Sequence, residues 1–437
     1  MAAQDVAGLD LLQGGGNVPQ CTHHRLAPET AGALAREPRV LGIKDSAGDF
    51  AVFLGYLAIR RVQPVFRVLQ GRLRYNRAHP PRRGGPRRDS MATWLCVLIT
   101  VLVAVPAWAE LALPPGFTAQ VYVTGLGFDS GSERGIRGIP AVATIGFDAL
   151  GTLYLARTGA RFRSGEAEDL SPIYRIPAGG ARLTPETEPR YLYGPPLRNP
   201  QIGAVRGRGE VFVTTYDRDR RTGALYRMTD GRPRLLAGGT PLDGSPPLFR
   251  QPDGVAVDAA GHLYVADREQ GRVVRLDASG KVLDPRHLAI MRPRMLVADE
   301  KGHLWIGGDG SAETPFQDGA GQIWRAGPDG GLTLVLSGPL PAGLSLSPGG
   351  ALFVAQRRTG RLFVVTAEGK RIDFASGGDG TFLRGLAFAP VTAETRRAGI
   401  AGDLFVITVS RQVWSINEVI RISGPFDEFV RRESAAP

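Results

Sequence analysis

The chain has 437 residues, of which 43% are hydrophobic and 22% charged, so most of it is expected to fold around a core. Gly (58) and Pro (33) together make up about one residue in five, which favours turns and short strands over long helices. Only two cysteines are present, which excludes a disulfide scaffold or a cysteine-based zinc module.

The formal net charge of +11 is unevenly distributed along the chain. Residues 1–90 hold 14 Lys+Arg and 7 Asp+Glu, and residues 91–109 hold none of these types. The remaining residues, 110–437, keep a balance of only +4. Because most of the excess lies in the first fifth of the chain, it does not indicate a nucleic-acid-binding domain. The charge distribution indicates a composite of several segments.

Residues 1–71 alternate between helical and strand patterns. Helical stretches at 31–36 and 50–59 flank a strand that begins at Val40, and a further strand covers 65–71. The run Gly42-Ile-Lys-Asp-Ser-Ala-Gly-Asp49 resembles the dihydrodipicolinate synthase/N-acetylneuraminate lyase family. This resemblance implies an α/β barrel in which Lys44 would form a Schiff base with a keto acid.

The lyase resemblance is incomplete. The family places a tyrosine just before Asn-Val-Pro, whereas three glycines precede Asn17 here. An eight-stranded barrel also needs about 250 residues. Residues 1–71 are therefore expected to be an inactive TIM-barrel fragment, and Lys44 to be vestigial.

Residues 72–90 contain seven arginines together with Pro-Pro and Gly-Gly pairs. They could be a basic tail that binds nucleic acid or a solvated linker. Neither a pattern of aromatic residues interleaved with the arginines nor a folded scaffold supports recognition, so a linker is favoured.

Residues 91–109 have the three parts of a secretory signal. Arginines lie upstream, an uncharged run covers 94–109, and Ala107-Trp-Ala109 provides a small-x-small cleavage pattern. The run is shorter than the roughly 20 residues of a membrane-spanning helix. The alternatives are a buried helix or an uncleaved anchor. We expect a native start at Met91, cleavage after Ala109, a periplasmic or secreted protein and no stable membrane span.

A repeat of about 50 residues runs through 110–437. Its middle strand begins with an apolar residue and continues in the pattern Tyr/Phe/Trp-Val/Ile/Leu-small. The copies begin at Leu153, Val211, Leu263, Leu304, Leu352 and Leu404. Six copies of about four strands each predict an all-β fold, a six-bladed β-propeller. Residues 117–123 are expected to close the ring by pairing near 419–422 or 426–430.

The run Pro252-Asp-Gly-Val-Ala-Val-Asp258 and the Leu-Tyr-Val-Ala-Asp267 that follows it resemble NHL repeats. They also resemble the six-bladed gluconolactonase/regucalcin and strictosidine-synthase-like propellers. The resemblance covers 110–437, and it implies the fold rather than one activity, because such propellers host lactonases, other hydrolases, synthases and binding modules. Leu113-Pro-Pro-Gly-Phe117 resembles quinoprotein sugar dehydrogenases, without a supporting histidine.

Loops that enter the first strand of each blade, and loops that leave the second strand, are expected to line one mouth of the central channel. They carry several arginines, whose guanidinium groups would suit a carboxylate or phosphate. The alternative is that these arginines are simply exposed to solvent. The candidate binding residues are Asn199, Arg250, Asp253, Arg292, Arg294, Asp309 and Arg384.

The gluconolactonase resemblance implies a divalent cation held by a Glu, an Asn and an Asp. Asp253 matches the Asp, so calcium or another divalent ion is conceivable as a cofactor. Ile202 stands where the Asn is expected, and the Glu has no match near 139–144. Pro-Asp-Gly is also a common turn sequence, so Asp253 is either a turn residue or a metal ligand.

Two functions follow from these residues. The first is an exported binding or scaffold propeller for an anionic small molecule or a peptide. The second is a metal-dependent lactonase or hydrolase of the gluconolactonase type with an altered ligand set. Nucleic acid is not an expected partner.

Overall fold

The computed structural model describes residues 10–13, 40–45, 67–70, 111–128, 138–158, 170–311, 320–357, 359–366, 368–377, 381–410 and 416–435. The chain divides into two compact units, 1–102 and 103–437. Among the described residues, no helix is both long and apolar enough to cross a membrane.

The first unit contains a three-stranded sheet of β1 (Asp10–Gln13), β2 (Val40–Asp45) and β3 (Arg67–Gln70). β1 and β2 are antiparallel, whereas β2 and β3 are parallel. Parallel neighbours need a crossover connection, which agrees with the predicted strand–helix–strand order. The predicted helices at 31–36 and 50–59, the linker 72–90 and the signal segment 91–109 lie outside the described residues.

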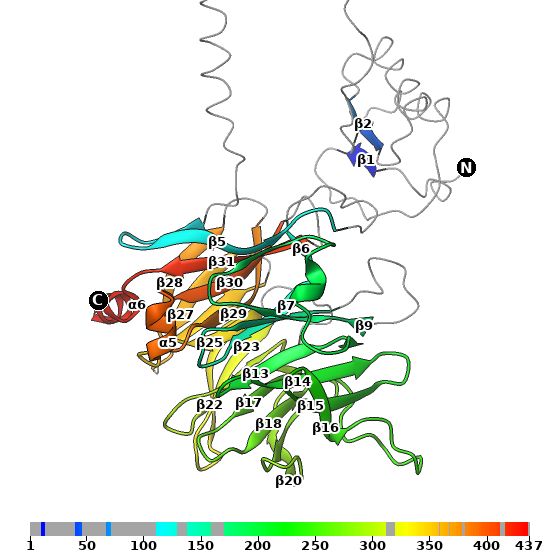
Figure 1. Ribbon diagram of the computed structural model, residues 1–437. Coiled ribbons are helices and arrows are strands. Elements are labelled where there is room, and N and C mark those ends of the chain that lie inside the picture. Colours follow the sequence, from blue (N-terminus) through cyan, green and yellow to red (C-terminus); the bar gives the residue numbers. More distant parts are fainter. Residues whose placement is uncertain are drawn as a thin grey trace, which may run out of the picture. The chain divides into compact units, whose positions relative to one another are not determined.

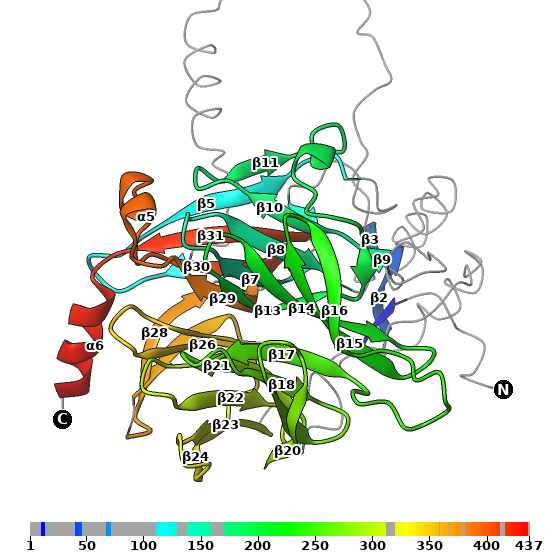
Figure 2. The same cartoon turned by 60° about the horizontal axis from the view of Figure 1, so that its bottom comes forward.

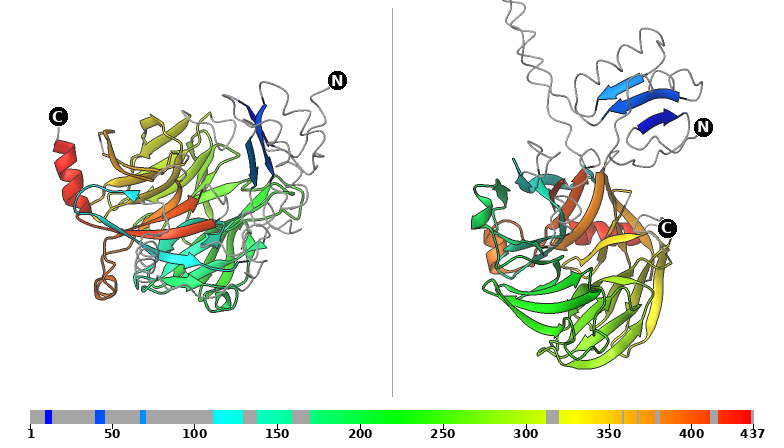
Figure 3. Two further views of the ribbon diagram at one scale, coloured as in Figure 1. Left: turned by 90° about the horizontal axis from the view of Figure 1, so that it is seen from above. Right: turned by 90° about the vertical axis from the view of Figure 1, so that its right-hand side faces the viewer.

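The second unit is a six-bladed β-propeller, as predicted. Its blades are antiparallel sheets that follow one another around a ring, in the colour order green, yellow and orange on the right of Figure 3. Blade 1 contains β7 (Val142–Phe147), β8 (Leu153–Arg157) and β10 (Ile173–Ile176), and blade 2 contains β13 (Gln201–Arg206), β14 (Glu210–Asp217), β15 (Thr222–Thr229) and β16 (Arg232–Gly238). Blade 3 contains β17 (Pro252–Val257), β18 (Leu263–Asp267), β19 (Arg272–Leu276) and β20 (Val282–Ala289), and blade 4 contains β21 (Pro293–Ala298), β22 (Leu304–Gly308), β23 (Gly321–Ala326) and β24 (Leu332–Gly338). Blade 5 contains β25 (Pro341–Leu346), β26 (Leu352–Gln356), β27 (Arg361–Val365) and β28 (Arg371–Gly377), with β4 (Leu111–Ala112) added at its outer edge.

Blade 6 joins the two ends of the propeller. It contains β29 (Thr381–Phe388), β30 (Leu404–Ser410) and β31 (Ile416–Ser423) from the end of the chain and β5 (Thr118–Gly125) from its beginning. Figures 1 and 2 show β5 in cyan lying beside β31 in red. The register places Ala119 opposite Ile422 and Val123 opposite Val419, which confirms the first of the two predicted pairings. The second is wrong, because residues 426–430 belong to the helix α6 (Phe426–Ala435).

Several short strands and helices are added to the four-stranded pattern of the blades. β6 (Ile139–Pro140) pairs with β31, β11 (Ala181–Leu183) pairs in parallel with β5, and β9 (Leu170–Ser171) pairs with β12 (Leu197–Arg198). A helix, α5 (Ala393–Arg397), lies between β29 and β30, and a 3₁₀ turn covers Glu188–Arg190. In blade 1 the segment after this turn takes the outermost place, because the amide of Arg175 donates to Tyr191 and the amide of Tyr193 donates to Ile173.

In the described part of the propeller, six apolar clusters form the core, and each of them joins two adjacent blades. Successive side chains of a strand point to opposite faces, so a strand between two blades must be apolar on both. In blade 2, Val211 and Val213 pack towards blade 1, while Phe212 packs towards blade 3. This double burial explains the unbroken apolar middle strand of the repeat.

Candidate functional site

The six inner strands β7, β13, β17, β21, β25 and β29 form a closed ring, because each contacts the next and β29 contacts β7. Neighbouring inner strands lie especially close together at their glycine residues. A Cβ at Gly254 would lie 2.4 Å from the backbone oxygen of Arg294, and one at Gly343 would lie 2.9 Å from that of Arg384. Neighbouring inner strands therefore approach one another backbone to backbone around the channel.

A cavity of about 360 Å³ lies at the end of the channel where the inner strands begin. This volume falls within the range of small-molecule sites in proteins. Its lining comes from all six inner strands, from the residues that follow the middle strands of blades 1, 3 and 5, and from the end of the middle strand of blade 6. The site is therefore built by the repeat itself, with one or more positions contributed by every blade.

One repeat position supplies a side chain from each blade. In five blades this position lies ten residues before the first apolar residue of the middle strand, and in blade 6 the insertion of α5 lengthens the interval. In blade order, the residues are Ala143, Gln201, Asp253, Arg294, Ala342 and Arg384, and all six line the cavity. The position is thus charged in blades 3, 4 and 6 and small in blades 1 and 5.

Asp309, which follows the middle strand of blade 4, gathers arginines from three blades. Its side chain is only 1% exposed. Arg268 approaches it with Nε at 2.8 Å and Nη2 at 2.7 Å from the same carboxylate oxygen, while Nη1 atoms of Arg294 and Arg357 lie 3.5 and 3.8 Å from the other. A buried carboxylate requires such partners, because an isolated buried charge is costly.

Asp253 shares one of these arginines. Its Oδ2 lies 3.3 Å from Nε of Arg294. Burial raises the pKa of Asp253, and the charges of Arg294 and Arg268 oppose that rise. Burial alone would lower the pKa of Arg294, but Asp309 and Asp253 outweigh it and raise that pKa. Asp253, Arg294 and Asp309 therefore form one paired network on the channel wall.

Arg384 differs from the other cavity arginines. Its Nη1 donates to the backbone oxygen of Val142 at 3.2 Å, and among the described residues no carboxylate pairs with it. Burial and the positive charge of Arg294 lower the pKa of Arg384 to about 10. The guanidinium thus remains charged at neutral pH and carries an electrostatic cost that the described residues do not offset.

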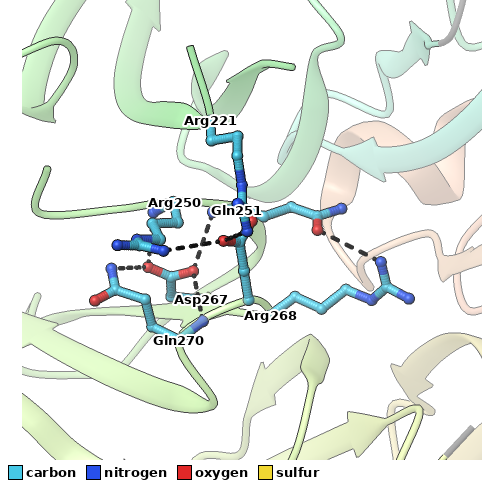
Figure 4. A network of polar contacts seen from close by, with 7 residues as sticks. Arg221, Arg250, Gln251, Asp267, Arg268 and Gln270 are labelled. Carbon is cyan, nitrogen blue, oxygen red and sulfur yellow. Dashed lines mark hydrogen bonds and ion pairs between the residues drawn. The ribbon is translucent and has the colours of Figure 1, made fainter. Parts of the chain in front are cut away.

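A polar network behind blade 3 holds Arg268 in place (Figure 4). The buried carboxylate of Asp267 accepts the backbone amides of Arg250 and Gln251, each at 3.0 Å, and the side-chain amide of Gln270 at 2.7 Å. The side chain of Gln251 in turn points to Arg268, 3.5 Å from its Nη1. Asp267 therefore ties the loop before β17 to the loop after β18, from which Arg268 reaches Asp309.

Residues 249–276 match the NHL repeat. This match covers the first three strands of blade 3, which contribute Asp253 and Arg268 to the cavity. No curated protein matches the sequence.

Solved structures similar to this propeller include proteins with different described roles. An auxiliary nutrient binding protein from Bacteroides thetaiotaomicron is 11% identical, with a TM-score of 0.48 over 70% of this chain and 76% of that one. An aldose sugar dehydrogenase from Streptomyces coelicolor, solved in its PQQ-bound form, is 15% identical, with a TM-score of 0.46 over 71% and 99%. A gluconolactonase from Xanthomonas campestris is 18% identical, with a TM-score of 0.32 over 52% and 95%.

The propeller brings four of the predicted site residues together and separates the others. Asp253, Arg294 and Arg384 line the cavity, and Asp309 lies behind it. The cavity lining does not include the remaining three propeller residues, which are Asn199, Arg250 and Arg292. The backbone of Lys44 lies in β2, and its side chain lies outside the described part of the chain.

The three separated residues have local roles. Asn199 is buried in a left-handed turn (φ 41°), and its side-chain amide donates to the Tyr216 carbonyl at 3.0 Å. Arg250 pairs with Glu269 at 3.4 Å on the surface. Arg292 also adopts a positive φ (48°), and its carbonyl accepts the amide of Asp309. Each therefore shapes a loop near the mouth of the channel.

Two cavity arginines, Arg268 and Arg357, were not among the predicted site residues. Each stands five residues after the start of its middle strand, the same repeat position as Asp309 in blade 4. Comparison of this repeat position across the copies would have indicated Arg268, Asp309 and Arg357 together as candidate site residues.

The residues present do not fit a divalent cation. Asp253 on the cavity wall and Asp309 behind it already pair with arginine, and the four arginines that line the cavity outnumber them. Within the described ranges, no group of three or more His, Cys, Asp or Glu residues is placed to hold a metal ion. A hard cation needs about six oxygen ligands and would be repelled by these arginines.

Proposed function

We propose that this propeller is a binding module that holds an anionic group, a carboxylate or phosphate, at the mouth of its channel. The observation that supports the proposal is Arg384, a half-buried cation that lines the cavity and has no carboxylate partner among the described residues. A bound anion would provide the missing counter-charge.

The arrangement of the ring supports this role. Arg294 in blade 4 and Arg384 in blade 6 flank blade 5, which places the small Ala342 at the same repeat position. Two guanidinium groups with a short side chain between them leave room for an anion that contacts both. Charge-assisted hydrogen bonds of this kind are about twice as strong as neutral ones.

The test is anion binding to the full-length chain, measured by isothermal titration calorimetry with acetate and inorganic phosphate. Arg384→Met should weaken binding about 10- to 100-fold, as expected for the loss of a charged hydrogen bond. Arg397→Met is a matched control, because Arg397 lies on α5 with its side chain 75% exposed. Equal affinities of the two variants would refute the proposal.

A metal-dependent lactonase or hydrolase is the second candidate, and it rests only on the match of Asp253 to a gluconolactonase-type ligand. Because Asp253 pairs with Arg294, we expect no calcium binding and no turnover of simple lactones. Calcium-dependent hydrolysis that Asp253→Asn abolishes would establish the enzyme instead.

We also propose that the propeller is exported by means of residues 91–109. Expression from Met91, followed by cell fractionation and N-terminal sequencing, should give a mature chain that begins at Glu110. A chain that retains residues 91–109 in the cytoplasm would contradict this.

The lyase-like fragment is proposed to be inactive. Borohydride reduction of the full chain with pyruvate should yield no covalent adduct at Lys44, because the barrel that would bury this lysine and lower its pKa is too short to close. Peptide mass spectrometry would detect an adduct and thereby overturn this expectation.

A further inference from the structure

The anion site opens onto an apolar chamber. The inner strands continue from the charged repeat position with large apolar side chains one or two residues later. The apolar residues at these positions that line the cavity are Ile145, Ile202, Met295, Leu296, Leu344 and Leu386. The cavity therefore changes from charged to apolar along the direction of the strands.

Blade 6 extends the apolar wall. Phe382 and Leu383 precede Arg384, and Val409 lies near the end of the middle strand β30 of the same blade. The arginine without a carboxylate partner thus lies in the blade with the most apolar lining. The uncharged polar side chains of the cavity, Thr144, Thr158 and Gln201, come from the first two blades instead.

The volume of the chamber exceeds that of an anionic head group. A water molecule occupies about 30 Å³ in the liquid, so 360 Å³ corresponds to about a dozen waters. A carboxylate beside Arg384 and Arg294 would fill only a fraction of this space. The rest borders on side chains that gain from contact with apolar groups rather than with water.

We infer that the ligand is an amphipathic carboxylate, with its head at Arg384 and Arg294 and an apolar body against the wall that contains Ile202, Met295 and Leu386. This inference rests on the proposed anion-binding function and adds the nature of the ligand body. A polyhydroxylated acid of the same charge fits less well, because the apolar wall would leave its hydroxyl groups without partners.

The test is a series of carboxylates of equal charge, acetate, butyrate and hexanoate, titrated into the full-length chain. Each buried methylene should strengthen binding about fourfold, so hexanoate should bind at least tenfold more tightly than acetate. Gluconate, which also has six carbons but carries hydroxyl groups, should bind no better than acetate.

Met295→Gln probes the wall while nearly preserving side-chain size. It should weaken hexanoate binding several-fold more than acetate binding. Leu283→Gln is the control, because Leu283 is 48% exposed and does not line the cavity. It should leave both affinities unchanged.

The outcomes separate the two proposals. If acetate and hexanoate bind equally and Arg384→Met weakens both, the anion site stands and the amphipathic ligand is refuted. Gluconate that binds more tightly than hexanoate would refute the inference in the same way. If none of the carboxylates binds, both the anion-binding function and this inference fail.

Discussion

Replacement of Arg384 by methionine should stabilise the protein in the absence of ligand. Burial and the nearby Arg294 lower the pKa of Arg384 to about 10, a change worth about 3 kcal/mol at neutral pH. Methionine has a similar length and no charge. Loss of the hydrogen bond to Val142 should cost about 1 kcal/mol, which leaves a net gain of about 1–2 kcal/mol.

The sign of the pH dependence follows from the lowered pKa. The folded protein holds the proton less tightly than the unfolded chain, so the cost is present in full below pH 10. The cost declines as the pH rises from about 10 towards the ordinary pKa of arginine, where both states lose the proton. Arg384→Met should therefore gain most at neutral pH.

The assay is thermal unfolding. An unfolding entropy of about 2.1 cal/mol/K per residue over roughly 330 residues converts 1 kcal/mol into about 1.5 °C, so Tm should rise by about 2–3 °C. The control Arg397→Met should change Tm by less than 1 °C. A bound anion should raise the Tm of the wild type but not that of Arg384→Met. A lower Tm for Arg384→Met than for the control would refute the idea that Arg384 is an uncompensated charge.

Three further substitutions test the architecture around the site. Asp309→Asn should cost about 3–5 kcal/mol because it removes the buried carboxylate that pairs with Arg268, Arg294 and Arg357, whereas Asp373→Asn, at a 68% exposed side chain, should cost less than about 1 kcal/mol; thermal unfolding would show both. Gly254→Ala should cost about 1–3 kcal/mol and weaken anion binding, because the new Cβ would lie 2.4 Å from a backbone oxygen of β21. Gly179→Ala is the control, because a Cβ at this position would meet no atom within 4 Å, and it should leave the free energy of unfolding unchanged in a denaturant titration of both variants. Phe429→Ala should cost about 3–5 kcal/mol in guanidinium unfolding, because this buried ring anchors α6 to blade 5; a loss below about 1 kcal/mol would show that α6 is dispensable.

The ring could be predicted because one blade is one sequence repeat. Leu263 and its counterparts mark the middle strands, and their number gives the number of blades. The elements that do not follow the repeat, β4 and α6, form where tertiary contacts decide the local structure. The pair of residues in β4 becomes a strand only because β28 offers it an edge, and Phe426 begins a helix because its ring packs against Phe117, Phe353 and Phe388.

The site was only partly predictable for a related reason. Asp253 and Arg294 share a repeat position, so their common orientation follows from the alignment of the copies. The grouping of Arg268, Arg294 and Arg357 around Asp309 depends on pairing across three blades, which no single copy encodes. Arg292 precedes a cavity strand, but its positive φ turns the chain there, and local sequence does not reveal such a conformation.

The closure of blade 6 has a consequence for how the chain folds during synthesis. β5 leaves the ribosome early, yet its partner β31 follows about 290 residues later. At about 5–20 residues per second, β5 waits roughly 15–60 s with one sheet edge bare. Unpaired edges invite association with other chains, so the nascent propeller is most vulnerable to aggregation just before its last blade is translated.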